Sequence, residues 1–265
     1  MKLKKIIGLT VAAALAISLT SCAKTPESLI EKADKKLGRS TYTVEVDIDY
    51  TAGDKEMSGI LDQLEGAETK LYFDGEDVFI EQRMTLDYGE GSTEFFGDHV
   101  IVGDTVYSHS GYTISGGGNT QKRMTAITDE QREALIEKAG IVIGIGIEDF
   151  STVTLDKTDG DHFITCTGAD EELNIMLENI LVSQFEGVAQ SIAVSNVRML
   201  VEIEGGRYDT VSLTCDYGIV LSSKTYSAKA EFELEYDYDG HSKVKVPGNV
   251  NEYDPADFNS ILNTI

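Results

Sequence analysis

The sequence has no tryptophan, only three prolines and three cysteines in 265 residues, and too few cations to balance its acids. It contains 22 lysines and arginines against 46 aspartates and glutamates, which gives a net charge of −24. This balance excludes a nucleic-acid-binding protein, because binding to phosphates needs clustered cations. A hydrophobic content of 41% with so little proline indicates a folded globular chain with ample material for a core.

The few cysteines also exclude a disulfide framework. Cys166 and Cys215 both lie in segments with strand character, and Cys215 shares a strand face with Val211 and Leu213. Buried free thiols are the favoured interpretation, because free cysteine is among the most buried residue types. A disulfide between the two stays open, since an exported protein permits one. No metal is expected, because neither cysteine has the spacing of a metal ligand.

Motifs for catalysis are missing as well. The four histidines are scattered without paired spacing, and no nucleophile elbow, zinc-protease motif or phosphate-binding loop occurs. Ser108 and Ser110 flank His109, but neighbouring strand residues point to opposite faces and are poor partners for proton transfer. We therefore expect neither an enzyme nor a cofactor.

The N-terminus has the layout of a secretory signal. Three lysines in the first five residues precede residues 6–19, which are almost wholly apolar and uncharged. This run is too short to be taken as a spanning helix on length alone. The segment that follows resembles the bacterial lipobox, in which small residues precede the lipidated cysteine: Leu19, Thr20, Ser21 and Cys22.

The lipobox resemblance implies a signal peptide over residues 1–21 and a lipid-anchored protein on the extracytoplasmic face of the cell membrane. Cys22 would carry the acyl chains, and two or more chains anchor a protein stably. Residues 22–25 would form a short tether, residues 26–250 a single domain, and residues 251–265 a C-terminal tail or short helix. The membrane, reached through Cys22, is the expected partner; the sequence does not identify a protein partner.

Strict alternation of apolar and polar residues predicts strands over residues 42–50 and 231–239. Alternation of this kind is typical of an antiparallel sheet with one solvated face. The acids of 231–239 are explained by that solvated face or by protection of a sheet edge, and loose binding of a divalent cation stays open. Further strand candidates lie at 56–64, 69–74, 77–87, 92–96, 99–109, 150–156, 162–167, 197–204 and 208–216.

Three amphipathic helices are also expected. Thr25 and Pro26 predict a helix start that leads to Gly38, and a capping box at Thr128 predicts a second helix that ends near Gly140. A third helix, from 170 to 185, has an apolar stripe formed by Leu173, Met176, Leu177, Ile180 and Leu181. The expected fold class is α+β, with a curved antiparallel sheet wrapped around these helices. Residues 115–120 are expected to form a flexible lid, a joint or an exposed connector.

The order of these elements resembles the LolA/LppX-type lipoproteins. The resemblance rests on the lipobox, the first helix, the meandering strands, the segment 101–107 followed by Gly111 and Tyr112, and the closing strand that runs into Pro247. It implies a half-barrel whose apolar concavity holds a lipid-like molecule. The residues expected along that concavity are Val44, Val46, Ile48, Leu173, Leu177, Ile180, Leu213, Phe232 and Leu234.

Two functions from different classes follow. The first is a membrane-anchored lipoprotein that binds a lipid or another hydrophobic ligand without catalysis. The alternative is an interaction or scaffold module whose concavity is filled by its own helices. An open ligand site of several hundred cubic ångströms would favour the first function.

Overall fold

The computed structural model describes most of the chain after Lys24: residues 24–38, 40–53, 57–58, 67–87, 91–115, 117–140, 142–185, 189–221, 223–239 and 243–265. The expected signal peptide and the lipobox residues Leu19, Thr20, Ser21 and Cys22 lie outside these residues. Every helix and strand with assigned bounds falls between Lys24 and Ile265. A form of the chain that begins at Lys24 therefore retains the complete described fold.

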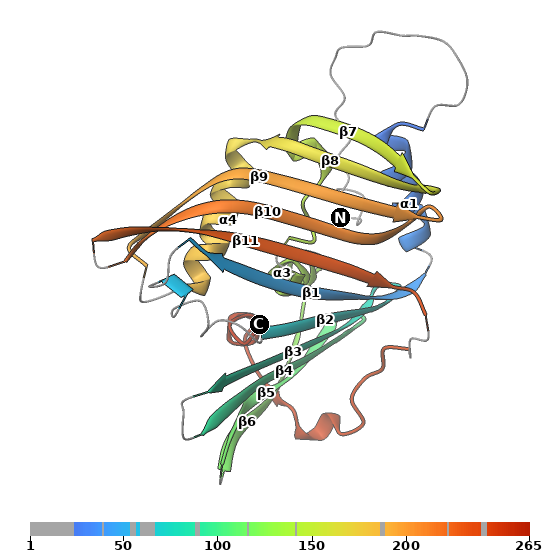
Figure 1. Ribbon diagram of the computed structural model, residues 1–265. Coiled ribbons are helices and arrows are strands. Elements are labelled where there is room, and N and C mark those ends of the chain that lie inside the picture. Colours follow the sequence, from blue (N-terminus) through green and yellow to red (C-terminus); the bar gives the residue numbers. More distant parts are fainter. Residues whose placement is uncertain are drawn as a thin grey trace.

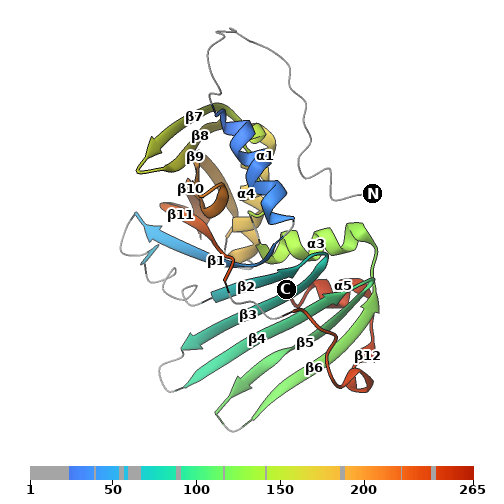
Figure 2. The ribbon, with the colours of Figure 1, turned by 90° about the vertical axis from the view of Figure 1, so that its right-hand side faces the viewer.

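Twelve strands form one large sheet in the order β12-β6-β5-β4-β3-β2-β1-β11-β10-β9-β8-β7. All neighbouring strands are antiparallel except the two-residue β12, which pairs with β6 in parallel. The sheet is open, with β7 at one edge and β12 at the other (Figures 1 and 2). The strands are β1 (Thr41–Ala52), β2 (Ala67–Asp74), β3 (Asp77–Asp87), β4 (Ser92–Val102), β5 (Thr105–Ile114), β6 (Gly117–Ala126), β7 (Phe150–Thr158), β8 (Asp161–Ala169), β9 (Ser191–Glu204), β10 (Arg207–Leu221), β11 (Lys224–Asp237) and β12 (Asp254–Pro255).

Tight turns join most neighbouring strands. The turn between β9 and β10 consists of Gly205 and Gly206, both with positive φ (56° and 77°). Glycine adopts this conformation without a steric penalty, and two such residues fit the twist of a hairpin. Strands joined by these turns lie side by side in the sheet. Two pairings are long-range, β1 with β11 and β12 with β6, and β6 and β7 lie far apart although they follow one another along the chain.

The helices all lie on one side of the sheet, which we call the inner face (Figure 2). They are α1 (Pro26–Leu37), α3 (Asp129–Gly140), α4 (Glu171–Gln184) and α5 (Phe258–Leu262), with short 3-10 turns at Ile147–Asp149 and Val250–Glu252. The described residues therefore form an α+β fold, a mostly antiparallel sheet with helices on its inner face.

The sequence signals for two helix starts are confirmed. The side chain of Thr25 accepts a hydrogen bond from the backbone N–H of Ser28, and Pro26 occupies the first turn of α1. At α3, the Gln131 N–H donates to Thr128 Oγ1 at 3.3 Å, while the Thr128 N–H donates to Gln131 Oε1 at 3.0 Å. These bonds satisfy backbone donors that have no partner within the helix.

Polar contacts fix α1 against the ends of β9 and β10. The Tyr208 hydroxyl donates to Asp34 Oδ1 at 2.7 Å, and Lys36 Nζ donates to the carbonyl oxygen of Gly205 at 2.5 Å. Leu29 and Ala33 are buried beneath the helix. The first described helix, which begins at Pro26, thus lies firmly on the sheet.

Three expectations for local structure were wrong. The segment 99–109 is not one strand, because Gly103 and Asp104 form a turn between β4 and β5. Residues 117–120 are not a connector: they begin β6, which pairs with β5 along its whole length. The strand expected over 56–64 lies mostly outside the described residues, and Met57 and Ser58 within it are helical.

Candidate functional site

The nine residues expected along the concavity lie in one hydrophobic core between the sheet and the helices. Ile48 and Ile180 are half-buried at its margin, and the other seven are buried. Val44, Leu177 and Phe232 are 0% exposed. A side chain that borders an open space keeps some accessible area, so these three side chains are fully enclosed by packed neighbours. Their contact with a ligand stays a prediction.

The α4 helix contributes to this core with fewer residues than expected. Leu173, Leu177 and Leu181 are buried, but Met176 is 36% exposed and does not belong to the buried stripe. Ile175 and Val182 are also exposed, at 49% and 42%. The helix is therefore apolar on two sides, one packed on the sheet and one open to solvent.

The inner face continues across β3, β4 and β5, where it is covered less completely. Met84 lies opposite Phe95, and Phe95 lies opposite Tyr112. Together with Leu86 and Ile114 they form one apolar surface near the far ends of these strands, which we call the apolar strip: Met84, Leu86, Phe95, Tyr112 and Ile114. Tyr112 is 39% exposed and Ile114 is 47% exposed. In Figure 2 no described helix covers these strand ends.

A row of polar side chains crosses the same face closer to the helices. His99 of β4 lies opposite Ser108 of β5, which lies opposite Arg123 of β6. His99 and Ser108 are buried, and neither the His99 ring nitrogens nor Ser108 Oγ has a hydrogen-bond partner within the described residues. Buried polar groups without partners are rare in folded proteins. We call these three residues the polar row.

Burial lowers the pKa of His99 to about 4, while the nearby carbonyl oxygen of Thr264 opposes this shift. A folded-state pKa below the unfolded value means that His99 stabilises the fold above pH 6.5, and that this stability is lost as the pH falls toward 4. We expect the loss to reach about 3 kcal/mol in the wild type and to be largely absent from His99→Gln. Urea unfolding of both proteins between pH 7 and pH 4 measures the difference; equal losses in the two would contradict the prediction.

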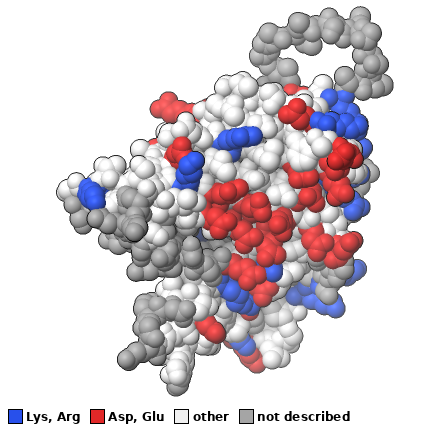
Figure 3. Space-filling model, viewed as in Figure 1, with Lys and Arg blue, Asp and Glu red and all other residues white. Residues whose placement is uncertain are grey.

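The outer face of the sheet is strongly acidic (Figure 3). Carboxylates lie directly opposite one another between β1 and β11: Glu45 with Glu235, Asp47 with Glu233 and Asp49 with Glu231. The pKa of Asp47 and that of Glu233 are both raised, first by burial and then by the neighbouring carboxylates. Like charges in opposed positions destabilise a sheet, so this face opposes folding at neutral pH.

Replacing Glu233 with glutamine should therefore stabilise the protein at pH 7, by about 0.5 to 1 kcal/mol. A raised carboxyl pKa means that the repulsion is relieved by protonation as the pH falls, so the gain should shrink at pH 4. Glu94→Gln is the matched control, because Glu94 lies opposite two threonines. The urea unfolding midpoints of the three proteins at both pH values measure the gain in stability. A gain from Glu94→Gln as large as that from Glu233→Gln would show that the opposed charges are not its cause.

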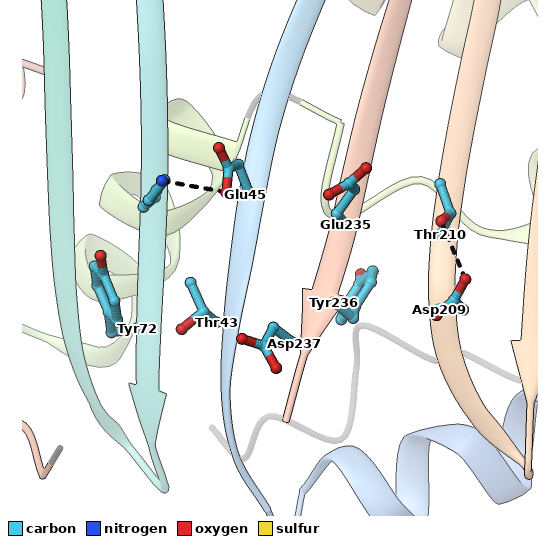
Figure 4. A pocket seen from close by; sticks show the side chains of 9 residues that line it. Thr43, Glu45, Tyr72, Asp209, Thr210, Glu235, Tyr236 and Asp237 are labelled. Carbon is cyan, nitrogen blue, oxygen red and sulfur yellow. Dashed lines mark hydrogen bonds and ion pairs between the residues drawn. The ribbon is translucent and has the colours of Figure 1, made fainter. Parts of the chain in front are cut away.

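A shallow cavity of about 390 Å³ opens on this outer face (Figure 4). Lys70 lines it and forms ion pairs with Glu45 at 3.2 Å and Glu68 at 2.7 Å. The residues around it are mostly polar: Thr43, Glu45, Lys70, Tyr72, Asp209, Thr210, Glu235, Tyr236 and Asp237. A polar, acid-lined cavity does not suit an acyl chain.

Among the described residues, no group of three or more His, Cys, Asp or Glu side chains could hold a metal ion.

The two cysteines are buried and unpaired, as expected. Burial raises the pKa of both thiols to about 11, so they are protonated and unreactive at neutral pH.

Within the part of the chain that the structure describes, none of the helices has the length and apolar character needed to cross a membrane.

Comparisons with known proteins give no family. No family model matches the chain, and no curated protein matches it. A solved N-terminal dehydratase from the difficidin assembly line matches with 11% identity and a TM-score of 0.13, over 73% of this chain and 94% of that one. An inactive mutant of the CurJ dehydratase matches with 6% identity and a TM-score of 0.14, over 74% of this chain and 75% of that one. Likeness at this level carries no argument about function.

Sequence reasoning missed the apolar strip and the polar row. Both depend on the cross-strand register of β3 to β6, and β6 was not expected to be a strand. Residues 119–125 are polar on both faces apart from Met124, so they lack the apolar alternation that would have predicted β6. The turn at Gly103 places Ser108 opposite His99, and the hairpin between β5 and β6 places Arg123 opposite Ser108.

Proposed function

We propose that this chain is a lipoprotein, anchored through Cys22 at the extracytoplasmic face of the cell membrane, that binds a hydrophobic molecule without catalysis. Its folded domain would be a half-barrel of the LolA/LppX type. The open sheet with its helices on the inner face supports this architecture. The short stretch between Cys22 and the start of α1 at Pro26 would hold the domain close to the lipid surface.

The observation that carries the proposal is the apolar strip. Tyr112 and Ile114 expose large apolar side chains on the inner face, next to the half-buried Met84 and Phe95. Contiguous exposed apolar surface is typical of binding sites, because water contact with it is unfavourable. The ligand position that we propose therefore lies on β3 to β5, away from the filled core beneath α1 and α4.

A second function, that of an interaction or scaffold module, is favoured by a different observation. Leu177 and Phe232 are fully buried, so the region expected to hold a ligand is filled by the protein itself. In this account the exposed apolar residues of α4, such as Ile175 and Val182, would contact a protein partner.

Uptake of a fluorescent acyl probe by the soluble form beginning at Lys24 separates the two. Lipid binding predicts saturable uptake that Ile114→Asp reduces at least about tenfold, since a buried charge opposes an acyl chain. Val182→Asp is the matched control, because it places the same charge on a similarly exposed apolar residue of α4. Absence of saturable uptake by the wild type would leave the scaffold function, and equal losses in both variants would remove the strip as the site.

A further inference from the structure

The C-terminal segment, residues 254–265, lies on the inner face beside the polar row (Figure 2). Its regular elements are short, since β12 has two residues and α5 has five. Ile261 is its main apolar anchor and is fully buried. Ala256, Phe258, Leu262 and Ile265 also pack against the core, but only as partly buried side chains. A segment of two short elements at the edge of the sheet, with one fully buried side chain, opens more easily than a strand inside the sheet.

Cations from two different elements hold this segment by its backbone carbonyl groups. Arg123 Nη1 of β6 donates to the Ser260 carbonyl oxygen at 2.9 Å, and Lys138 Nζ of α3 donates to the Leu262 carbonyl oxygen at 2.8 Å. Among the described residues, no carboxylate forms an ion pair with either cation. The last carbonyl groups of a helix carry partial negative charge. The two cations thus contact neutral backbone oxygens, and each would bind a charged anion more strongly in their place.

The polar row has further unused hydrogen-bonding capacity at the same place. Among the described residues, Ser108 Oγ has no hydrogen-bond partner, and the carbonyl oxygen of Thr264, which lies over Gly97, is the one polar group found to interact with the His99 ring. A Cβ atom at Gly97 would lie 2.9 Å from His99 Nε2, so glycine leaves space beside the His99 ring that a larger residue would fill. Beyond Gly97 the same face continues into the apolar strip, starting at Phe95.

We propose that Arg123, His99 and Lys138 form the headgroup site for an anionic amphiphile, which the C-terminal segment covers until the ligand displaces it. The acyl chain would lie along the apolar strip. This inference rests on the proposed function and names its ligand class, an acyl chain that ends in a carboxylate or a phosphate. An anion would pair with two cations that now contact only carbonyl oxygens. It would also accept hydrogen bonds from Ser108 and, in place of the Thr264 carbonyl oxygen, from the His99 ring.

The test is displacement of a fluorescent acyl probe from the soluble form by oleate and by oleyl alcohol, which have the same chain and differ in the headgroup. Oleate should compete at least about tenfold more strongly. Arg123→Gln should remove that preference and leave oleyl alcohol unchanged, while Arg123→Lys retains part of it. Lys229→Gln, which removes a cation on β11, should change nothing. Lysophosphatidylglycerol in a parallel arm distinguishes a phosphate from a carboxylate headgroup.

Hydrogen exchange gives a second readout, since oleate should accelerate exchange in residues 257–265 and oleyl alcohol should not. If Arg123→Gln does not fold by circular dichroism, Lys138→Gln takes its place, with a smaller expected loss of preference. Equal competition by oleate and oleyl alcohol in the wild type would overturn the headgroup site while hydrophobic binding stands. If the wild type takes up no acyl probe at all, the proposed function fails with it.

Discussion

Replacing Cys22 with alanine should move the protein almost completely from the membrane fraction to soluble or unprocessed forms. Each buried methylene of an acyl chain contributes about 0.8 kcal/mol to membrane anchoring, and no other segment outside the signal is apolar enough to replace that contribution. The net charge of −24 adds no attraction to anionic head groups. Detergent fractionation of the expressing cells, with immunodetection, measures the change.

The matched control is Cys166→Ala, because Cys166 is a buried, unpaired thiol within the fold. Its membrane fraction should equal that of the wild type. If processed Cys22→Ala stayed in the membrane fraction and needed detergent for release, the lipid anchor would be refuted.

Replacing Leu177 with alanine should lower the free energy of unfolding by about 2 to 5 kcal/mol. Leu177 is fully buried at the centre of α4, and the enclosed core around it leaves a cavity when the side chain is truncated. Ile175→Ala on the same helix is the control: its side chain is 49% exposed, so its loss should be clearly smaller. Urea unfolding of the three proteins measures both values.

A cost well below 2 kcal/mol for Leu177→Ala would show that the site is loosely packed or borders an open space. In that case the concavity beneath α4 would again be a candidate ligand site. A cost within the expected range supports the filled core and directs the search for a ligand to β3–β5.

Much of the fold was predictable because local patterns dominate it. The alternation in β1 and β11 follows from a sheet with one solvated face, and the capping residues Thr25 and Thr128 mark helix starts by hydrogen bonds to their own first turns. The pairing of β1 with β11 was not predictable, because it joins residues about 190 positions apart through register alone.

The candidate site was less predictable than the fold. His99, Ser108 and Arg123 are separated along the sequence and come together only through two hairpins, one of which starts in a glycine-rich stretch typical of loops. Met176 was placed in the buried stripe because it is apolar and near Leu177, whereas the rotation of α4 on β9 exposes it. Tertiary packing decided both outcomes.

Native mass spectrometry of the soluble form with increasing oleate tests the central claim most directly, that the inner face binds a hydrophobic molecule. We expect one adduct per chain that saturates, persists in Val182→Asp and is lost in Ile114→Asp. No adduct, or an unsaturable series of adducts that is the same in all three proteins, would contradict the account.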